Sequence, residues 1–422
     1  MEELRCGSAD ARALASETLS FDRLGAGLLD PFMRYPIRLD DRARELLCTV
    51  YGAKSGPVSP FKVLAFRVIW VEVSIMDAAA FHQFLAGAQA YFDFLRTAQT
   101  EKLSPQVITH RASSLRLINA KIANVETAST DGVVASLVLL ARYYQMIGDF
   151  EKWRMHMLGL KEIIRIRGDI DATGMNELLR HMLSNIDISG SFALDAVPIF
   201  PIPARLLPTA CARSPSTVLR PFAKHFITIC RGILPDHVQL IEIISDICIE
   251  NQHFLGEILR TKGTLWTETM YICHYVNPQL HRLLCLPEID QSLPHVWVAE
   301  AFRLGATIYL AAIRYAFGIS PFQSGESARK IKALFDRLEH TGTEQATLDL
   351  LQDVGCGWLK LWVLGCAAIN RPSGADGYWF LDQLHAEMTK FGMETYDDFE
   401  QYAGSLLWIP EVHGLLLRNL DI

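Results

Sequence analysis

The residue types best suited to chemistry are two cysteines and two histidines that lie close together in the second half of the chain. They are Cys273, His274, His281 and Cys285. Thiolate and imidazole groups are the usual ligands of structural zinc. Their spacing is not that of a known structural zinc site, and leucines surround them. We therefore predict buried thiols and partly exposed histidines on a helix pair, with a zinc site as the alternative.

Other catalytic patterns are weaker still. His385-Ala-Glu387 resembles the start of a deaminase signature, but no Pro-Cys-x-x-Cys follows it. Gly25-Ala-Gly27 lacks the third glycine of a dinucleotide fingerprint and follows no predicted strand. A phosphate-binding loop, a His-Glu-x-x-His helix and a Gly-x-Ser-x-Gly turn do not occur. The sequence thus predicts no enzyme, and no catalytic, cofactor-binding or metal-binding residue.

The basic residues do not form a phosphate-binding surface in the sequence. Arg111, Arg116 and Lys121 recur every five residues, so they do not share one narrow helical stripe. Lys161 and Arg165 belong to the solvated side of an amphipathic helix. The chain has a net charge of −7 and a pI of about 6.0. Since nucleic-acid binding needs clustered cations, we predict no DNA-binding residues in this chain.

Composition points to a folded intracellular protein. Of the 422 residues, 50% are hydrophobic and 21% are charged, which is too apolar for a disordered chain. The nine cysteines are an odd number scattered through apolar stretches, as expected for reduced thiols. The first residues contain no apolar signal region, and Val296–Gly318 is interrupted by charges. We expect a soluble intracellular protein without a membrane span.

The elements that position these residues are predicted to be helices. Apolar residues recur at three- and four-residue steps in several stretches. The predicted helices of the first half are Asp40–Tyr51, Asp77–Thr97, Pro105–Glu126, Asp131–Ile147 and Phe150–Arg167. Asp131 is a predicted N-cap and Gly168 a predicted C-cap. Period-two alternation typical of strands is not found.

A proline-rich segment separates two helical parts. Residues 194–222 contain six prolines, a density that regular helix does not tolerate. We predict a crossing loop there and a return to helix at Asp236. The fold class is therefore all-α: a large irregular helical domain in two halves joined by a proline-rich loop. Residues 1–29 are predicted to be a flexible tail and residues 30–422 one domain.

Several phrases resemble the fungal-specific transcription factor domain, in the order expected for that family. They are Asp30-Pro31-Phe32 with Tyr35-Pro36, the apolar helix Asp131–Ala141, Trp153-x-x-His156-x-x-Gly159-Leu160 with Arg167-Gly168, Glu300-x-x-Arg303, and Trp379-Phe380 with Trp408. The resemblance implies an all-helical regulatory domain. The positions of these residues on their helices predict structural roles. Trp153 and His156 lie three apart on one helical face and can pack or pair together, and Glu300 and Arg303 can form an ion pair in the same way. Gly159 can allow a close helix crossing.

The resemblance also implies a function in the nucleus. Members of the family usually begin with a six-cysteine zinc cluster, whereas residues 1–29 contain only Cys6. We therefore expect a transcriptional regulator of a metabolic or secondary-metabolite gene set that reaches DNA only indirectly. Its expected partner is a DNA-binding transcription factor or the transcription machinery, with a small-molecule effector as a further possibility. Two alternatives stay open: a ligand-binding or enzymatic protein that has borrowed the fold, and a truncated gene model of a complete zinc-cluster factor.

Overall fold

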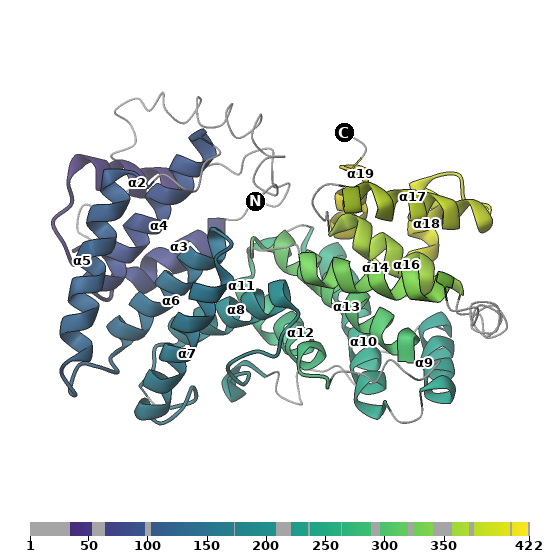
Figure 1. The fold of residues 1–422 in the computed structure, drawn as a ribbon, viewed down its shortest axis with the longest axis horizontal. Helices are drawn as coiled ribbons and strands as arrows, with labels where there is room; N and C mark the ends of the chain where they lie inside the picture. Colours follow the sequence, from purple (N-terminus) through teal and green to yellow (C-terminus); the bar gives the residue numbers. More distant parts are fainter. Residues whose placement is uncertain are drawn as a thin grey trace.

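All regular elements that the computed structural model describes are helices, which confirms the predicted all-α class (Figure 1). The structure describes residues 34–52, 64–97, 103–172, 174–207, 221–234, 237–262, 264–287, 296–319, 324–340, 357–370, 375–405 and 407–420. The predicted tail at residues 1–29 and the motif Asp30-Pro31-Phe32 lie outside these ranges. None of the described helices is both long enough and apolar enough to cross a membrane.

The first half is a bundle of long helices, drawn in purple to teal in Figure 1. Its helices are α2 (Asp41–Gly52), α3 (Leu64–Ser74), α4 (Ala78–Thr97), α5 (Pro105–Ile122), α6 (Asp131–Met146), α7 (Phe150–Arg167) and α8 (Glu177–Leu194). Helices α4, α5 and α6 pack on one another, and α7 packs on α6. Phe81, Val138 and Trp153 lie in the common core.

The second half, in green to yellow, is more irregular (Figure 1). Its longer helices are α9 (Pro221–Ile233), α10 (Val238–Thr261), α12 (Asn277–Leu284), α13 (Val296–Ala316), α14 (Gly325–His340), α16 (Gly357–Ile369), α17 (Ala375–Lys390) and α18 (Tyr396–Ala403). Short helical segments complete it: η2 (Ala204–Leu206), η4 (Thr264–Thr267), α11 (Thr269–Tyr271), η6 (Pro410–Gly414) and α19 (Leu415–Arg418). A π-helical turn, η5 (Ile272–Val276), leads into α12.

Helix α8 belongs to both hydrophobic cores. Leu179, Leu183 and Ile186 pack in the core of the first half. Ile188 and Phe192, further along the same helix, pack in the core of the second half. Helix α8 also contacts α12 and α14. The two halves therefore meet along α8, and burial on opposite sides fixes its position.

The five helices predicted for the first half are present, but α3 and α8 were not predicted, and α5 ends at Ile122 rather than at Glu126. Helix α7 has the predicted bounds, and Gly168 ends it in the left-handed conformation with φ 103°. The predicted cap of α6 is wrong: Thr130 is the N-cap residue and Asp131 begins the helix. Asp131 instead accepts a hydrogen bond from the Asn176 backbone and pairs with Arg167 at 2.5 Å. Its carboxylate ties the start of α6 to two later segments.

The proline-rich segment is an extended crossing over residues 195–207, with only the short η2 helix within it, while residues 208–220 lie outside the described ranges. Helix resumes at Pro221, earlier than the predicted Asp236. The prediction failed because proline is well tolerated in the first turn of a helix, where the missing N–H has no intrahelical partner. The described part of the loop is fixed by hydrogen bonds to α8 and α12.

Candidate functional site

The boundary between the halves is unusually polar for a buried surface. Helix α8 carries buried polar side chains along most of its length: Arg180, His181, Ser184, Asn185, Asp187, Ser189 and Ser191. Polar groups in such positions need hydrogen-bond partners, because an unpaired buried group loses its hydration without compensation. Asn185, Asp187 and Ser189 have partners in η5, α12, the crossing loop and α13, whereas Arg180 donates to the carbonyls of Ile170 and Ala172 before α8. This boundary is the candidate functional site.

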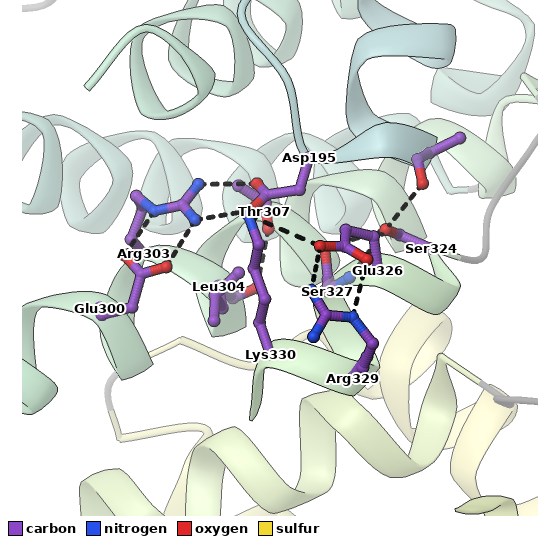
Figure 2. Close-up of polar contacts among 11 residues, drawn as sticks. Asp195, Glu300, Arg303, Leu304, Thr307, Ser324, Glu326, Ser327, Arg329 and Lys330 are labelled. Carbon is purple, nitrogen blue, oxygen red and sulfur yellow. Dashed lines mark hydrogen bonds and ion pairs between the residues drawn. The ribbon is translucent and has the colours of Figure 1, made fainter. Parts of the chain in front are cut away.

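An ionic node of four charged residues closes one end of the boundary (Figure 2). Asp195 ends α8 in a left-handed conformation with φ 45°. Its carboxylate accepts two hydrogen bonds of 2.8 Å from Arg303 of α13, one to each oxygen. Arg303 also pairs with Glu300 at 2.7 Å, and Lys330 of α14 pairs with Asp195 at 2.5 Å. The two negative charges of the carboxylates therefore balance the two positive charges of Arg303 and Lys330.

The balance of charges is reflected in the electrostatics of the ionic node. Burial alone would raise the pKa of Asp195, but hydrogen bonds and ion pairs with Arg303 and Lys330 outweigh it and hold the pKa below its usual value. Glu326 and Arg329 extend the network toward solvent on α14 (Figure 2). Breaking a buried pair of this kind is costly, so the node fixes α8 against α13 and α14.

The predicted pair of Glu300 and Arg303 is thus confirmed, but the sequence did not reveal its main partner. Asp195 lies more than a hundred residues earlier in the chain and follows α8 directly. An Asp after a helix is ordinarily interpreted as part of a turn. Only the packing of α8 against α13 brings Asp195 to Arg303, where its carboxylate accepts a bidentate contact from the guanidinium.

A second polar group, the Asn185 cluster, lies further along the same boundary. It consists of Asn185, Ser189, Cys273, Asn277 and Arg314. The Asn185 side chain accepts a hydrogen bond of 2.8 Å from Asn277 and donates to the Cys273 sulfur at 3.7 Å. The Arg314 guanidinium donates hydrogen bonds to the backbone carbonyl of Asn185 at 3.1 Å and to the Ser189 hydroxyl at 2.9 Å. Three segments of the second half therefore meet α8 at this point.

Several buried atoms in and beside the Asn185 cluster have no hydrogen-bond partner among the residues that the structure describes. They are Nε of Arg314, Oδ1 of Asn277 and both ring nitrogens of His181, which precedes Asn185 by one helical turn. Burial lowers the pKa of Arg314 to about 9 and that of His181 to about 4. At neutral pH the guanidinium is therefore charged and the imidazole neutral.

The Asn185 cluster holds no counter-charge for Arg314. Among the described residues, no carboxylate pairs with Arg314, which is 1% exposed. Burial raises the pKa of the Cys273 thiol to about 11, against smaller opposing effects of Asn185 and Arg314, so the thiol is not an anion at neutral pH. A buried cation without a partner is uncommon, because desolvation costs several kcal/mol per ion.

Asp187 anchors the crossing loop to the opposite side of α8. Its carboxyl oxygens accept backbone hydrogen bonds from Ile199 at 3.0 Å and from Phe200 at 2.8 Å. Burial raises its pKa to about 7 despite these two donors. His281 and His274 contact the same loop through the carbonyls of Phe200 and Leu206, at 2.9 and 2.8 Å.

The predicted cysteine and histidine set is therefore spread over different contacts. The prediction of buried thiols is right for Cys273, which contacts Asn185, and wrong for Cys285, which is exposed. The Cys285 sulfur lies 3.5 Å from Nδ1 of His281. His274 and His281 each face a loop carbonyl. No group of three or more potential ligands occurs among the residues that the structure describes. His385 stacks on Tyr396 and shares a 2.8 Å hydrogen bond with its hydroxyl.

Two packing roles predicted for α7 are wrong in detail. A Cβ added at Gly159 would meet open space, so this glycine makes no close crossing. The close crossing is at Gly190 of α8, where an added Cβ would lie 2.2 Å from the Trp153 ring. The rings of Trp153 and His156 have different neighbours. His156 stacks on Tyr144 of α6, with 5.1 Å between the ring centroids. Trp153 lies edge-on to Phe150 and against Gly190 of α8.

Three of the predicted cations make contacts within the protein: Arg111 and Lys121 contact other segments, whereas Arg165 pairs within its own helix on the surface. Arg111 donates to the Tyr144 hydroxyl at 2.7 Å and lies over the Tyr143 ring. Lys121 pairs with Asp77, and Arg165 pairs with Glu162 at 2.9 Å. These contacts reduce the charge available for phosphate groups.

The fold places the chain among large all-helical proteins with two joined cores. The family model for the fungal specific transcription factor domain matches residues 58–393. Because this match covers well over half of the chain, the chain belongs to that family. The match includes α8, the ionic node and the Asn185 cluster, whereas the opening motif before residue 58 and Trp408 lie outside it. No curated protein and no solved structure gives a significant match.

Membership of this family identifies a regulator of transcription of the fungal type, a class that is in general not enzymatic. The residues that form the boundary have structural contacts, which hold α8 against α12, α13 and α14. The sequence did not single out Arg314 or Asn185 as functional. The available signal was one arginine in the otherwise apolar second half of α13, which requires a polar partner elsewhere in the fold.

Proposed function

We propose that this protein acts in the nucleus as a transcriptional regulator of a metabolic or secondary-metabolite gene set, through a DNA-binding partner. The observation that carries the proposal is the family match over residues 58–393. Residues 30–422 would act as one regulatory unit. The net charge of −7 and the engagement of Arg111, Lys121 and Arg165 in protein contacts favour indirect recruitment to DNA.

An exposed apolar stripe on α5 supports binding of a protein partner. Ile108, Leu115 and Ile122 are 54%, 38% and 43% exposed and recur every seven residues. Ala112 and Asn119, also exposed, lie between them at heptad spacing. A seven-residue repeat of apolar side chains with small or amide residues between is the pattern by which one helix binds another.

The charge of α5 favours an acidic partner helix. Between Pro105 and Ile122 the helix has no acidic residue, and the exposed Arg116 flanks the stripe next to Leu115. Glutamates beside a coiled-coil seam commonly pair with basic residues of the facing helix. Helix α5 lies at the outer edge of the first half, so a partner helix can reach it (Figure 1). We therefore assign the α5 stripe as the partner-binding surface.

Chromatin immunoprecipitation of a tagged copy expressed from its own locus tests the proposal. We expect enrichment at a small set of promoters, and loss of that enrichment when one DNA-binding factor is deleted. The variant Leu115→Asp should remain folded and lose promoter enrichment. Leu259→Asp is the matched control, because Leu259 is a single exposed leucine on α10, at 77% exposure.

Two outcomes would contradict the proposal. Abundant tagged protein in the cytosol without promoter enrichment would exclude a role on chromatin. Promoter enrichment that survives Leu115→Asp would place the partner-binding surface elsewhere than on α5. Circular dichroism of both variants shows whether each remains folded, so a loss of enrichment can be assigned to the stripe itself.

A further inference from the structure

Helix α7 has one face that the described fold leaves uncovered. The buried side of α7 packs on α6 and α8 and consists of Trp153, Met157, Leu160 and Ile164. The outer side carries three apolar side chains, Met155, Leu158 and Ile166, which are 57%, 46% and 69% exposed. Single exposed apolar residues are common on protein surfaces, but three of them along one helix form a surface on which another helix can pack.

Gly159 follows Leu158 on this outer side. Nothing in the described fold lies within 4 Å of a Cβ added at Gly159. Glycine weakens the interior of a helix relative to alanine, and no contact within the described chain requires a glycine here. The close helix crossing that the sequence predicted at Gly159 is therefore absent within the chain, but the space for a second helix is present.

The charged residues of the outer side are arranged symmetrically about Leu158. Arg154 and Glu162 lie four residues before and after Leu158, and Glu151 and Arg165 lie seven residues before and after it. All four are exposed. Steps of four and seven residues return to nearly the same side of an α-helix, so the four charges share one face with Leu158. At each distance one residue is acidic and its counterpart is basic.

This arrangement is complementary to a reversed copy of itself. When two copies of α7 lie antiparallel about a twofold axis at Leu158, a residue before Leu158 in one copy faces the residue equally far after it in the other. Arg154 then faces Glu162 of the second copy, and Glu151 faces Arg165 of the second copy. A parallel pair would instead place each charge against its own equivalent, so like charges would meet.

We propose that α7 is a homodimerisation surface, on which a second copy of this chain docks antiparallel about a twofold axis at Leu158. The two Leu158 side chains meet at the axis, Met155 and Ile166 add apolar contacts beside them, and Gly159 leaves room for the approach. The pair of Glu162 and Arg165 within one copy is largely exposed, with 61% and 72% of the side chains accessible. Exposed pairs are weak, so these charges can exchange partners in the dimer.

The dimer should be reversible. One pair of helices buries less than the roughly 800 Å² that each partner contributes to a standard stable interface, so we expect a dissociation constant on the order of 10 μM. Such a dimer would present two α5 stripes and would bind two partner molecules at once, a consequence that rests on the proposed function.

Sedimentation velocity of the purified full-length chain from about 1 to 100 μM tests the dimer. We expect a shift from monomer to dimer with concentration, and a weaker dimer at high salt because the charges are exposed. Leu158→Asp should remain monomeric throughout, since it places two carboxylates at the axis. Leu259→Asp on α10 is the matched control and should dimerise like the wild type. Circular dichroism shows that each variant is folded.

Charge exchange tests the antiparallel register. Arg154→Glu and Glu162→Arg should each raise the dissociation constant about tenfold or more, because like charges then face each other on both sides of the axis. An equimolar mixture of the two variants should dimerise about as tightly as the wild type, because the introduced glutamate of one faces the introduced arginine of the other. A fluorescent label on one variant distinguishes the mixed dimer.

The proposal is overturned if the wild type stays monomeric up to about 100 μM, or if Leu158→Asp dimerises like the wild type. A mixture that associates no more tightly than either charge variant alone would overturn the register. Leu115→Asp should still dimerise, and loss of the dimer in that variant would move the contact to α5 and overturn the assignment to α7. Because the dimer is measured on purified protein, it can fail while promoter enrichment succeeds, and the reverse.

Discussion

The ionic node and the Asn185 cluster have similar positions in the fold, but the hydrogen-bond partners of their arginines differ in charge. Both place an arginine of α13 against α8, and both are buried. Arg303 meets two carboxylates, Glu300 and Asp195, within 2.8 Å. Arg314 meets only a backbone carbonyl and a hydroxyl. The charges of the node balance among its own residues, whereas Arg314 pairs with no carboxylate among the described residues.

This contrast indicates that the two contacts do not hold the halves equally. A saturated ion network stabilises one relative position of the helices, because any movement separates buried charges. Arg314 gains only hydrogen bonds to uncharged groups, which offset less of its desolvation cost. We therefore expect the end of α8 at Asp195 to hold the halves together more firmly than the Asn185 cluster does.

The largest effect is expected from neutralising the shared carboxylate of the node. Asp195→Asn should lower the free energy of unfolding by about 3–5 kcal/mol, because it leaves Arg303 and Lys330 without their common partner. Urea denaturation followed by circular dichroism measures it, with Asp382→Asn on the exposed face of α17 as the control. A loss no greater than that of the control would show that the node does not hold the halves.

The contributions of Asp187 and Asp195 to the free energy of unfolding should depend on pH in opposite ways. Burial raises the pKa of Asp187 to about 7, so the folded state keeps a proton that the unfolded chain releases near pH 4. Its contribution to stability is therefore full at acid pH and is lost as pH rises from about 4 to 7, by roughly 2–4 kcal/mol.

Asp195 should behave in the opposite way, because Arg303 and Lys330 hold its pKa below the usual value. Its stabilisation is present above about pH 4 and is lost only as pH falls through the lowered folded-state pKa. Denaturation curves from pH 4.5 to 7.5 compare the wild type with Asp187→Asn. The variant should lack the decline with rising pH, and an unchanged slope would contradict the assignment.

A smaller effect is expected when the unpaired cation is removed. Arg314→Met should leave the free energy of unfolding unchanged or raise it by up to about 2 kcal/mol. Two hydrogen bonds are lost, but the desolvation cost of an unpaired guanidinium is lost as well. A decrease of more than about 2 kcal/mol in urea denaturation would mean that Arg314 is a structural member of the boundary, like Arg303.

The smallest effect is expected at the exposed end of the node. Arg329→Ala removes a pair with Glu326 that has a 2.5 Å contact but is largely exposed to solvent. Since exposed pairs are screened by water and salt, the unfolding midpoint should not change measurably. A clear decrease would show that the network gains from its outer members as well as from its buried ones.

The sequence by itself determined the helical class, most helix positions in the first half and the family. The apolar repeats of α4 to α7 and the glycine after Arg167 depend on local spacing, which is visible in the chain. Local chemistry also predicted the pair of Glu300 and Arg303, because residues three apart share one helical face. The sequence wrongly predicted a close helix crossing at Gly159. A glycine shows that another helix could approach closely, but it does not show whether one does.

Only the tertiary structure decided which polar groups are satisfied. Asp195 and Arg303, or Asn185 and Arg314, lie more than a hundred residues apart, and their contacts exist because α8 is buried between two cores. Whether a charge meets a counter-charge depends on the packing of whole helices. That packing results from the summed burial of many apolar side chains, so no local pattern could show that Arg303 also meets Asp195 or that Arg314 meets Asn185 and Ser189.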